Sequence, residues 1–124
     1  MIIDKINLAD KFRKINKHYD PKIIAELNGQ YMKLVKFKGD FVWHSHENED
    51  ESFMVIEGEF TIELRDKAIH LTEGELIVIP KGVEHRPIAK KEVKVLLFEP
   101  SSTINTGEAD SDFRQVNLDR IWIF

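Results

Sequence analysis

Between residues 22 and 99 the chain alternates short runs of β-forming residues with turn residues, and no helical periodicity interrupts them. The segment FTIELR places Phe60, Ile62 and Leu64 on one face of a strand and polar side chains on the other. Asn28-Gly29 separates two such runs, and this dipeptide is the strongest short hairpin signal. Short strands joined by tight turns predict an all-β sandwich or barrel.

Strand boundaries follow from the turn residues, including a tight turn expected at Gly58. We expect strands over residues 22–27, 31–37, 52–57, 59–65, 68–71, 76–80, 86–89 and 93–99. The strand LIVIP is apolar at both parities, which predicts that both of its faces are covered.

The two ends of the chain differ from this central region. Leu8, Phe12 and Ile15 follow helical spacing behind the capping residue Asn7, which predicts a short N-terminal helix. We expect one domain over residues 1–124, with an N-terminal helical segment at 1–20, a barrel at 22–99 and a C-terminal arm at 100–124. The arm ends in the apolar run IWIF, which we expect to dock on the barrel or on a second subunit.

Composition excludes several classes of function. The net charge is -4 with acidic and basic residues interspersed, so no electrostatic footprint for nucleic acid is expected. No cysteine is present, so any metal must be held by nitrogen and oxygen. Nothing approaches the ~20 apolar residues of a membrane span, and the N-terminus has no apolar core of signal-peptide length. We therefore expect no membrane partner and a cytoplasmic location.

The stretch WHSHENEDE places two histidines, His44 and His46, two positions apart, so on a strand they would share a face. Glu51 differs from the preceding acidic residues because it opens an apolar run and would share a face with Phe53 and Val55. A carboxylate at the edge of an apolar interior requires a partner, and a cation is a natural one. Trp43 is expected to face away from this site.

A second stretch, GELIVIPKGVEH, ends a strand at Pro80, turns at Gly82 and begins a new strand at His85. The two stretches fit H-x-H-(x)4-E and G-(x)5-P-x-G-(x)2-H. Together these patterns resemble the two motifs of the cupin superfamily, which are small double-stranded β-barrels of the jelly-roll type. The resemblance spans residues 39–85 in detail.

This resemblance implies that His44, His46, Glu51 and His85 bind one divalent cation inside the barrel. Three imidazoles and one carboxylate suit Fe(II), Mn(II), Ni(II), Zn(II) or Cu(II), whereas Ca(II) and Mg(II) prefer oxygen ligands. The remaining histidines, His18 and His70, are expected at the surface.

The function expected from such a site is metal-dependent enzymatic chemistry of the isomerase, lyase or dioxygenase type. The ligand would be a small oxygen-rich compound, such as a sugar derivative or a keto or hydroxy acid. The alternative is a non-catalytic module that binds or senses a small molecule. A DNA-binding regulator is disfavoured because no helix-turn-helix segment accompanies the barrel.

Residues around the metal site could contact this ligand, and we expect Met32, Phe53 and Arg86 to do so. No catalytic residue is singled out by spacing. Other groups considered as ligand contacts or catalysts are Glu49, Asp50, Glu84 and Tyr31, each of them more typical of a loop or rim. Met54 and Ile56 have the opposite parity to Glu51 and need a cover, which favours a homodimer.

Overall fold

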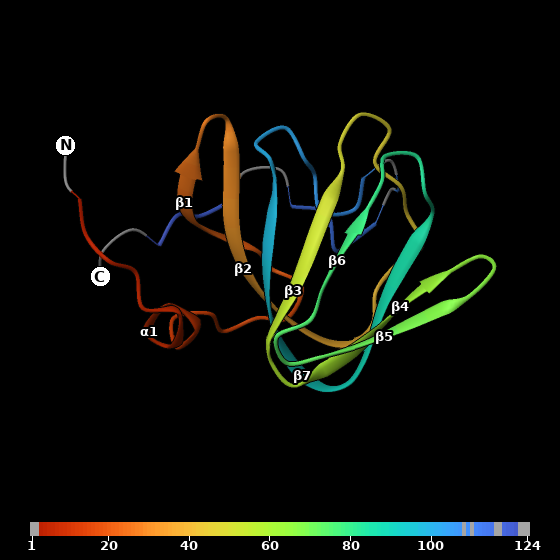
Figure 1. Ribbon diagram of the computed structural model, residues 1–124, viewed down its shortest axis with the longest axis horizontal. Coiled ribbons are helices and arrows are strands. Elements are labelled where there is room, and N and C mark those ends of the chain that lie inside the picture. The colour runs from red at the N-terminus through yellow and green to blue at the C-terminus, as the bar shows by residue number, and fades with distance from the viewer. Residues whose placement is uncertain (1–2, 108, 110, 116–117, 122–124) are drawn as a thin grey trace.

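The computed structural model describes residues 3–107, 109, 111–115 and 118–121. Within these residues a short helix precedes seven strands (Figure 1). The elements are α1 (Leu8–Phe12), β1 (Lys22–Leu27), β2 (Gln30–Asp40), β3 (Glu51–Glu57), β4 (Glu59–Leu64), β5 (Ala68–Thr72), β6 (Leu76–Ile79) and β7 (His85–Pro100). The strands pair antiparallel with one another and form a double-stranded barrel of the jelly-roll type, which confirms the predicted fold class.

Strand β7 organises the barrel because it pairs with three other strands. It pairs with β2 along most of its length, with β3 through its C-terminal half and with β4 through its N-terminal half. Residues 90–92 have no partner between the pairs Phe37↔Val93 and Gly39↔Ala89. The prediction of two separate strands at 86–89 and 93–99 is therefore wrong: they form one strand with an irregularity between them.

Two glycine-containing turns have the backbone that the sequence predicts. Asn28 and Gly29 have φ of 49° and 78°, and they connect the directly paired residues Leu27 and Gln30. Gly58 has φ of 98° between β3 and β4, and a Cβ there would lie 3.2 Å from the carbonyl oxygen of Glu92. Gly58 thus allows the chain to turn closely past β7.

The helix α1 covers part of the outer face of the sheet, beside β1 and β2 (Figure 1). Its N-cap is Asn7, whose side chain accepts a hydrogen bond from the backbone N–H of Asp10 at 3.0 Å. Phe12 and Ile15 are buried against Ile24 and Leu34. The predicted helix and its cap are confirmed.

Two local predictions are wrong. Strand β6 is covered on one side only: Leu76 and Val78 are 61% and 54% exposed, because β6 lies at the sheet edge with its outer face uncovered. The segment carrying His44 and His46 is not a regular strand, since His44 forms an isolated bridge to His85 and the residues up to Asp50 are loop.

The C-terminal arm returns along the barrel. Its first part turns repeatedly between Ser101 and Gly107, and Ile121 later packs in the cluster around α1. The backbone N–H of Ile121 donates to the carbonyl of Ile23 at 2.8 Å. The tail therefore docks on the barrel at Ile121, while the rest of IWIF, 122–124, lies outside the described residues. Among the helices described, none is long and apolar enough to cross a bilayer.

Candidate metal centre

Backbone pairing brings the two histidine-bearing segments together. His44 and His85 exchange backbone hydrogen bonds of 3.1 and 2.9 Å, and their ring centroids lie 4.3 Å apart. The carbonyl of His46 accepts a 2.8 Å hydrogen bond from the N–H of Gly82, which ties the first motif to the turn before His85. Glu51 is the first residue of β3 and pairs with Ile79 of β6.

Two of the imidazoles are oriented by backbone carbonyls. Nδ1 of His44 lies 2.8 Å from the carbonyl oxygen of Val42, and Nδ1 of His85 lies 2.9 Å from that of Val83. Each Nδ1 therefore carries the proton and donates it, which directs Nε2 of both rings toward the ligand group, where Nε2 of His85 lies 3.1 Å from Oε1 of Glu51. This arrangement is typical of metal-binding histidines, whose second nitrogen is fixed by an outer partner.

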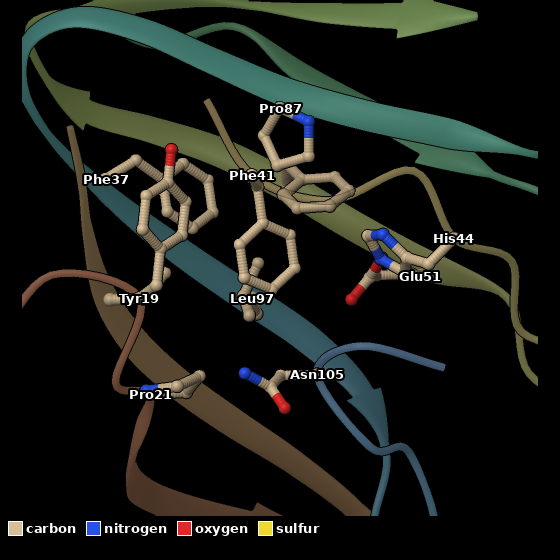
Figure 2. Close-up of a pocket in the computed structure, with 11 residues that line it drawn as sticks. Tyr19, Pro21, Phe37, Phe41, His44, Glu51, Pro87, Leu97 and Asn105 are labelled. Carbon is tan, nitrogen blue, oxygen red and sulfur yellow. The ribbon is translucent and has the colours of Figure 1, made fainter. Parts of the chain in front are cut away.

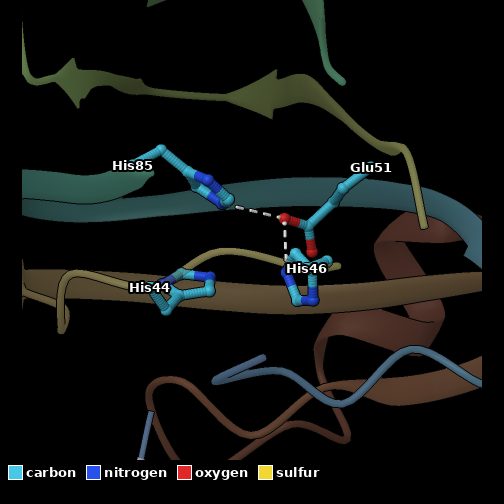
Figure 3. Close-up of side chains that lie close together, drawn as sticks. All are labelled: His44, His46, Glu51 and His85. Carbon is cyan, nitrogen blue, oxygen red and sulfur yellow. Dashed lines mark hydrogen bonds and ion pairs between the residues drawn. The ribbon is translucent and has the colours of Figure 1, made fainter. Parts of the chain in front are cut away.

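The four predicted ligands converge in the interior (Figure 3). His44, His46, Glu51 and His85 are all buried, and one ligand atom from each lies within 4.8 Å of all the others. Oε1 of Glu51 lies 3.1 Å from Nε2 of His85 and 3.2 Å from Nε2 of His46. A group with this spacing and this donor set can hold one metal ion.

The polar atoms of His46 give an independent test of whether a cation fits. Both of its ring nitrogens are buried and neither has the geometry of a hydrogen bond to any described residue, although Nε2 lies 3.2 Å from Oε1 of Glu51. Buried polar atoms without partners are rare and costly in folded proteins. A cation beside Nε2 of His46 would supply the missing partner, so the residues present fit a bound metal.

Electrostatics in the group favour a negative carboxylate surrounded by imidazoles. Burial by itself would raise the pKa of Glu51, but the His46 and His85 imidazoles outweigh it and hold the pKa well below its usual value. Burial and the nearby His85 ring lower the pKa of His44 to about 4, so that imidazole is neutral and available as a ligand at neutral pH.

A buried ion pair lies behind the metal group and was not expected from the sequence. Nζ of Lys33 donates to Oε1 of Glu99 at 2.7 Å, and both side chains are 1% exposed. Burial and the negative charge of Glu51 raise the pKa of Glu99 well above its usual value, although Lys33 partly offsets this. The sequence signal for their burial is the alternation of side chains along a strand. Lys33 lies on the same face of β2 as Val35, and Glu99 lies on the same face of β7 as Leu97.

A small cavity opens from the metal group into the barrel (Figure 2). Its empty space totals about 310 Å³, counting the part that opens to solvent. His44 and Glu51 lie at one end, and Tyr19 and Phe37 lie toward the other (Figure 2). The full lining comprises Tyr19, Pro21, Val35, Phe37, Phe41, His44, Glu51, Phe53, Pro87, Leu97 and Asn105.

The structure places the three residues predicted to contact a ligand in different surroundings. Phe53 lines the cavity and lies two positions after Glu51 on the same face of β3. Met32 instead packs with the cluster around α1, on the outer face of the sheet. Arg86 points to Glu63, with its Nε 2.9 Å from Oε1, and its guanidinium lies over the ring of Trp43. Of the three, only Phe53 faces the cavity.

The other polar residues near the motifs form the rim of the barrel. Oε2 of Glu49 accepts a hydrogen bond from Ser102, and Oδ1 of Asp50 accepts one from the N–H of Lys81. Glu84 pairs with Arg65 at 3.2 Å, and the hydroxyl of Tyr31 accepts from Arg120. Each of these groups is bound to another surface residue, away from the cavity lining.

The remaining histidines are at the surface, as predicted. Nε2 of His18 lies 2.8 Å from Oε1 of Glu92, with both side chains about 40% exposed. His70 is exposed on β5, where Nδ1 lies 3.0 Å from the hydroxyl of Thr61. Neither belongs to the buried group.

The fold and site together define a double-stranded β-barrel with a His₃Glu group that could bind a metal. Comparison with protein families agrees: the Cupin domain model matches residues 31–99. The chain therefore belongs to the cupin family.

Individual proteins are also similar to this chain. A crystal structure of a cupin-2 domain containing protein from Shewanella frigidimarina is 53% identical, with a TM-score of 0.76 over 77% of this chain and 93% of that chain. Protein NMB1881 from Neisseria meningitidis is 33% identical, with a TM-score of 0.73 over 79% of this chain and 100% of that chain. YdbB of Bacillus subtilis (strain 168) is 41% identical over 64 residues, which cover 51% of this chain and 57% of YdbB.

Proposed function

We propose that this cupin binds one divalent transition metal through His44, His46, Glu51 and His85, and that it is an enzyme acting on a small molecule that coordinates through oxygen. The observation that carries the proposal is the convergence of these buried donors, with both nitrogens of His46 lacking a hydrogen bond of good geometry within the described part of the chain. The reaction would be of the isomerase, lyase or dioxygenase type.

The metal would supply Lewis acidity toward a coordinated oxygen or, as iron, redox chemistry. The protein's own residues supply the rest. The Val42 and Val83 carbonyls fix the imidazoles of His44 and His85 with Nε2 turned toward the ligand group. The apolar walls of the cavity keep bulk water away from the metal group, which strengthens electrostatic interactions there.

Metal content tests the first half of this proposal. We expect about one Fe, Mn, Ni, Zn or Cu ion per chain after chelation and reloading, measured by elemental analysis. His46→Ala and His85→Ala should lose it, because each removes a ligand. His18→Gln and His70→Gln are matched controls that change surface histidines and should keep it. A wild-type protein that binds none of these ions after reloading would contradict the assignment.

A non-catalytic binding module is the second candidate, and one observation favours it. The cavity's polar groups other than the metal ligands are already bonded: the Tyr19 hydroxyl donates to the carbonyl of Gly39, and Asn105 bonds to Phe113 and Gln115. No free acid or base thus faces the cavity from the described lining. Screening oxygenated acids and sugars with Fe(II)- and Mn(II)-loaded protein separates the candidates, since an enzyme yields product and a module yields binding alone.

We also propose that two copies of the chain associate through the outer face of β3 and β6. Leu76 and Val78 are more than half exposed, and they pair directly with Met54 and Ser52 of β3. Ile56, expected to need the same cover, instead packs beside the cluster around α1. The uncovered apolar face thus runs from β6 across β3 to Phe98 of β7, which is 37% exposed and pairs with Ser52, and a second copy would remove this face from water.

Solution mass tests this association. The wild type should sediment as a dimer, and Leu76→Lys should shift it toward monomer because a charge cannot be buried there without a partner. Leu27→Lys is the matched control, since Leu27 is 50% exposed at the β1–β2 turn and away from this face. A wild-type monomer at all concentrations would refute the proposal.

A further inference from the structure

The cavity beside the metal group is lined largely by apolar side chains, many of them aromatic. The rings of Phe37, Tyr19 and Phe41 form a stack, with centroid separations of 5.0 and 4.7 Å and interplanar angles of 19°. Phe41 also meets the ligand His44 edge-on at 5.3 Å. The aromatic wall therefore extends from the far end of the cavity to the metal group, as Figure 2 shows.

Tyr19 is fixed firmly at this wall. Its backbone adopts φ of 57°, and its N–H donates to the carbonyl of Lys36 at 2.8 Å. Its hydroxyl donates to the carbonyl of Gly39, which turns the polar end of the ring toward β2. The cavity thus meets a carbon edge of this ring, whose faces are stacked on Phe37 and Phe41, and the hydroxyl is already satisfied.

The remaining non-ligand polar group is also engaged. Nδ2 of Asn105 donates to the carbonyl of Phe113 at 2.7 Å, and Oδ1 accepts from the N–H of Gln115 at 2.7 Å. No lysine or arginine is among the lining residues that the structure describes. A second carboxylate on the ligand, or a row of sugar hydroxyls, would lose water here without gaining hydrogen bonds.

We infer that the ligand of this site has one oxygen-donor group that coordinates the metal and an apolar body that packs on Phe41, Phe53 and the edge of Tyr19. The inference rests on the proposed metal site and narrows its ligand class. Aryl or alkyl keto and hydroxy acids and phenolic chelators belong to this class, whereas polyhydroxylated sugar acids do not. The cavity is narrow, with about 310 Å³ of empty space that includes open solvent, so the apolar body of the ligand must be small.

Hydroxamates with a common chelating head test the inference directly. The protein is loaded with Co(II), whose visible spectrum reports changes in coordination, and titrated with acetohydroxamate, benzohydroxamate and gluconohydroxamate. We expect benzohydroxamate to bind about tenfold tighter than acetohydroxamate, because its ring is buried against the aromatic wall. Gluconohydroxamate should bind no tighter than acetohydroxamate. Each affinity is compared with that for free Co(II), which removes differences in the chelating head.

A pair of matched variants locates the effect. Val35 and Val95 are both fully buried and pair directly across β2 and β7, but only Val35 lines the cavity. Val35→Ile should reduce the preference for benzohydroxamate several-fold by filling the cavity, while Val95→Ile should leave it unchanged. Thermal unfolding of both variants checks that neither is misfolded.

The possible failures are distinct. If the protein does not bind Co(II), the proposed metal site fails and the inference fails with it. If Co(II) binds but the benzo and aceto compounds bind equally, or the gluco compound binds tightest, the metal site stands and the apolar ligand class is overturned.

Discussion

Half of the barrel interior is apolar, built on Val55, Phe60 and Ile62, while the other half holds three imidazoles, two carboxyl groups and the ammonium of Lys33. The side chains of both halves are almost completely buried, so the two halves do not differ in their exposure to water. Burial stabilises the apolar half roughly in proportion to area. In the polar half burial has a cost that only partners can offset. The difference indicates that the polar half is maintained for binding rather than for stability.

The same strands build both halves. On the inner face of β2, Val35 and Phe37 are followed toward the strand start by Lys33, and on β7 Leu97 is followed by Glu99. One charged residue at the end of each apolar row thus borders the metal group. The contrast between halves can therefore be tested by single substitutions.

The largest effect is expected from Glu99→Leu. It leaves the Lys33 ammonium buried with no carboxylate partner among the described residues, beside the carbonyl of Thr103 at 3.5 Å and the ring of Tyr31 at 5.9 Å. Removing one partner of a buried ion pair costs about 3–5 kcal/mol of stability. Urea unfolding of the chelated protein measures this loss.

Two further variants sharpen that test. The double variant Lys33→Met/Glu99→Leu should recover most of the stability, since apolar residues can replace a buried pair at little cost. Glu57→Leu is the matched control, because Glu57 pairs with Lys94 at the surface and should change stability by less than about 1 kcal/mol. A loss for Glu99→Leu no larger than that of the control would remove the proposed contrast between the halves.

Metal binding should stabilise the fold almost as strongly. At a free concentration 1,000-fold above its dissociation constant, a metal that binds only the folded state adds about 4 kcal/mol. Urea unfolding with and without the metal measures the increase, which should vanish in His46→Ala because that variant lacks a ligand. An equal increase in His46→Ala would show that the metal binds elsewhere.

The four ligands and the barrel could be predicted from the sequence because their signals are local. Turn residues mark the strand ends, and the resemblance of the two motifs to those of the cupin superfamily implies that His44, His46, Glu51 and His85 lie together. The Lys33–Glu99 pair could not be predicted, since 66 positions separate its members and only strand register brings them together. The charged residues Lys90 and Lys91 interrupt the β-forming pattern between 86–89 and 93–99, so the sequence did not predict that β7 is one continuous strand.

The lining of the cavity was the least predictable part of the site. The sequence predicted a small oxygen-rich ligand that coordinates the metal, with Arg86 among its contacts. The structure ties Arg86 to Glu63 and brings Tyr19, from the N-terminal segment, to the cavity wall. No local pattern relates residue 19 to residue 44, because their proximity depends on how the segment before β1 packs on the barrel.

The smallest effect is expected in the apolar half. Ile62 is fully buried on β4, and Ile62→Val removes one methylene group, which costs about 1 kcal/mol. Because Ile62 lies outside the cavity lining and the metal group, the stabilisation by metal should be the same as in the wild type. Unfolding with and without metal measures both quantities. A change in the metal-dependent increment would show that the two halves are coupled, so that packing in the apolar half also sets the geometry of the ligands.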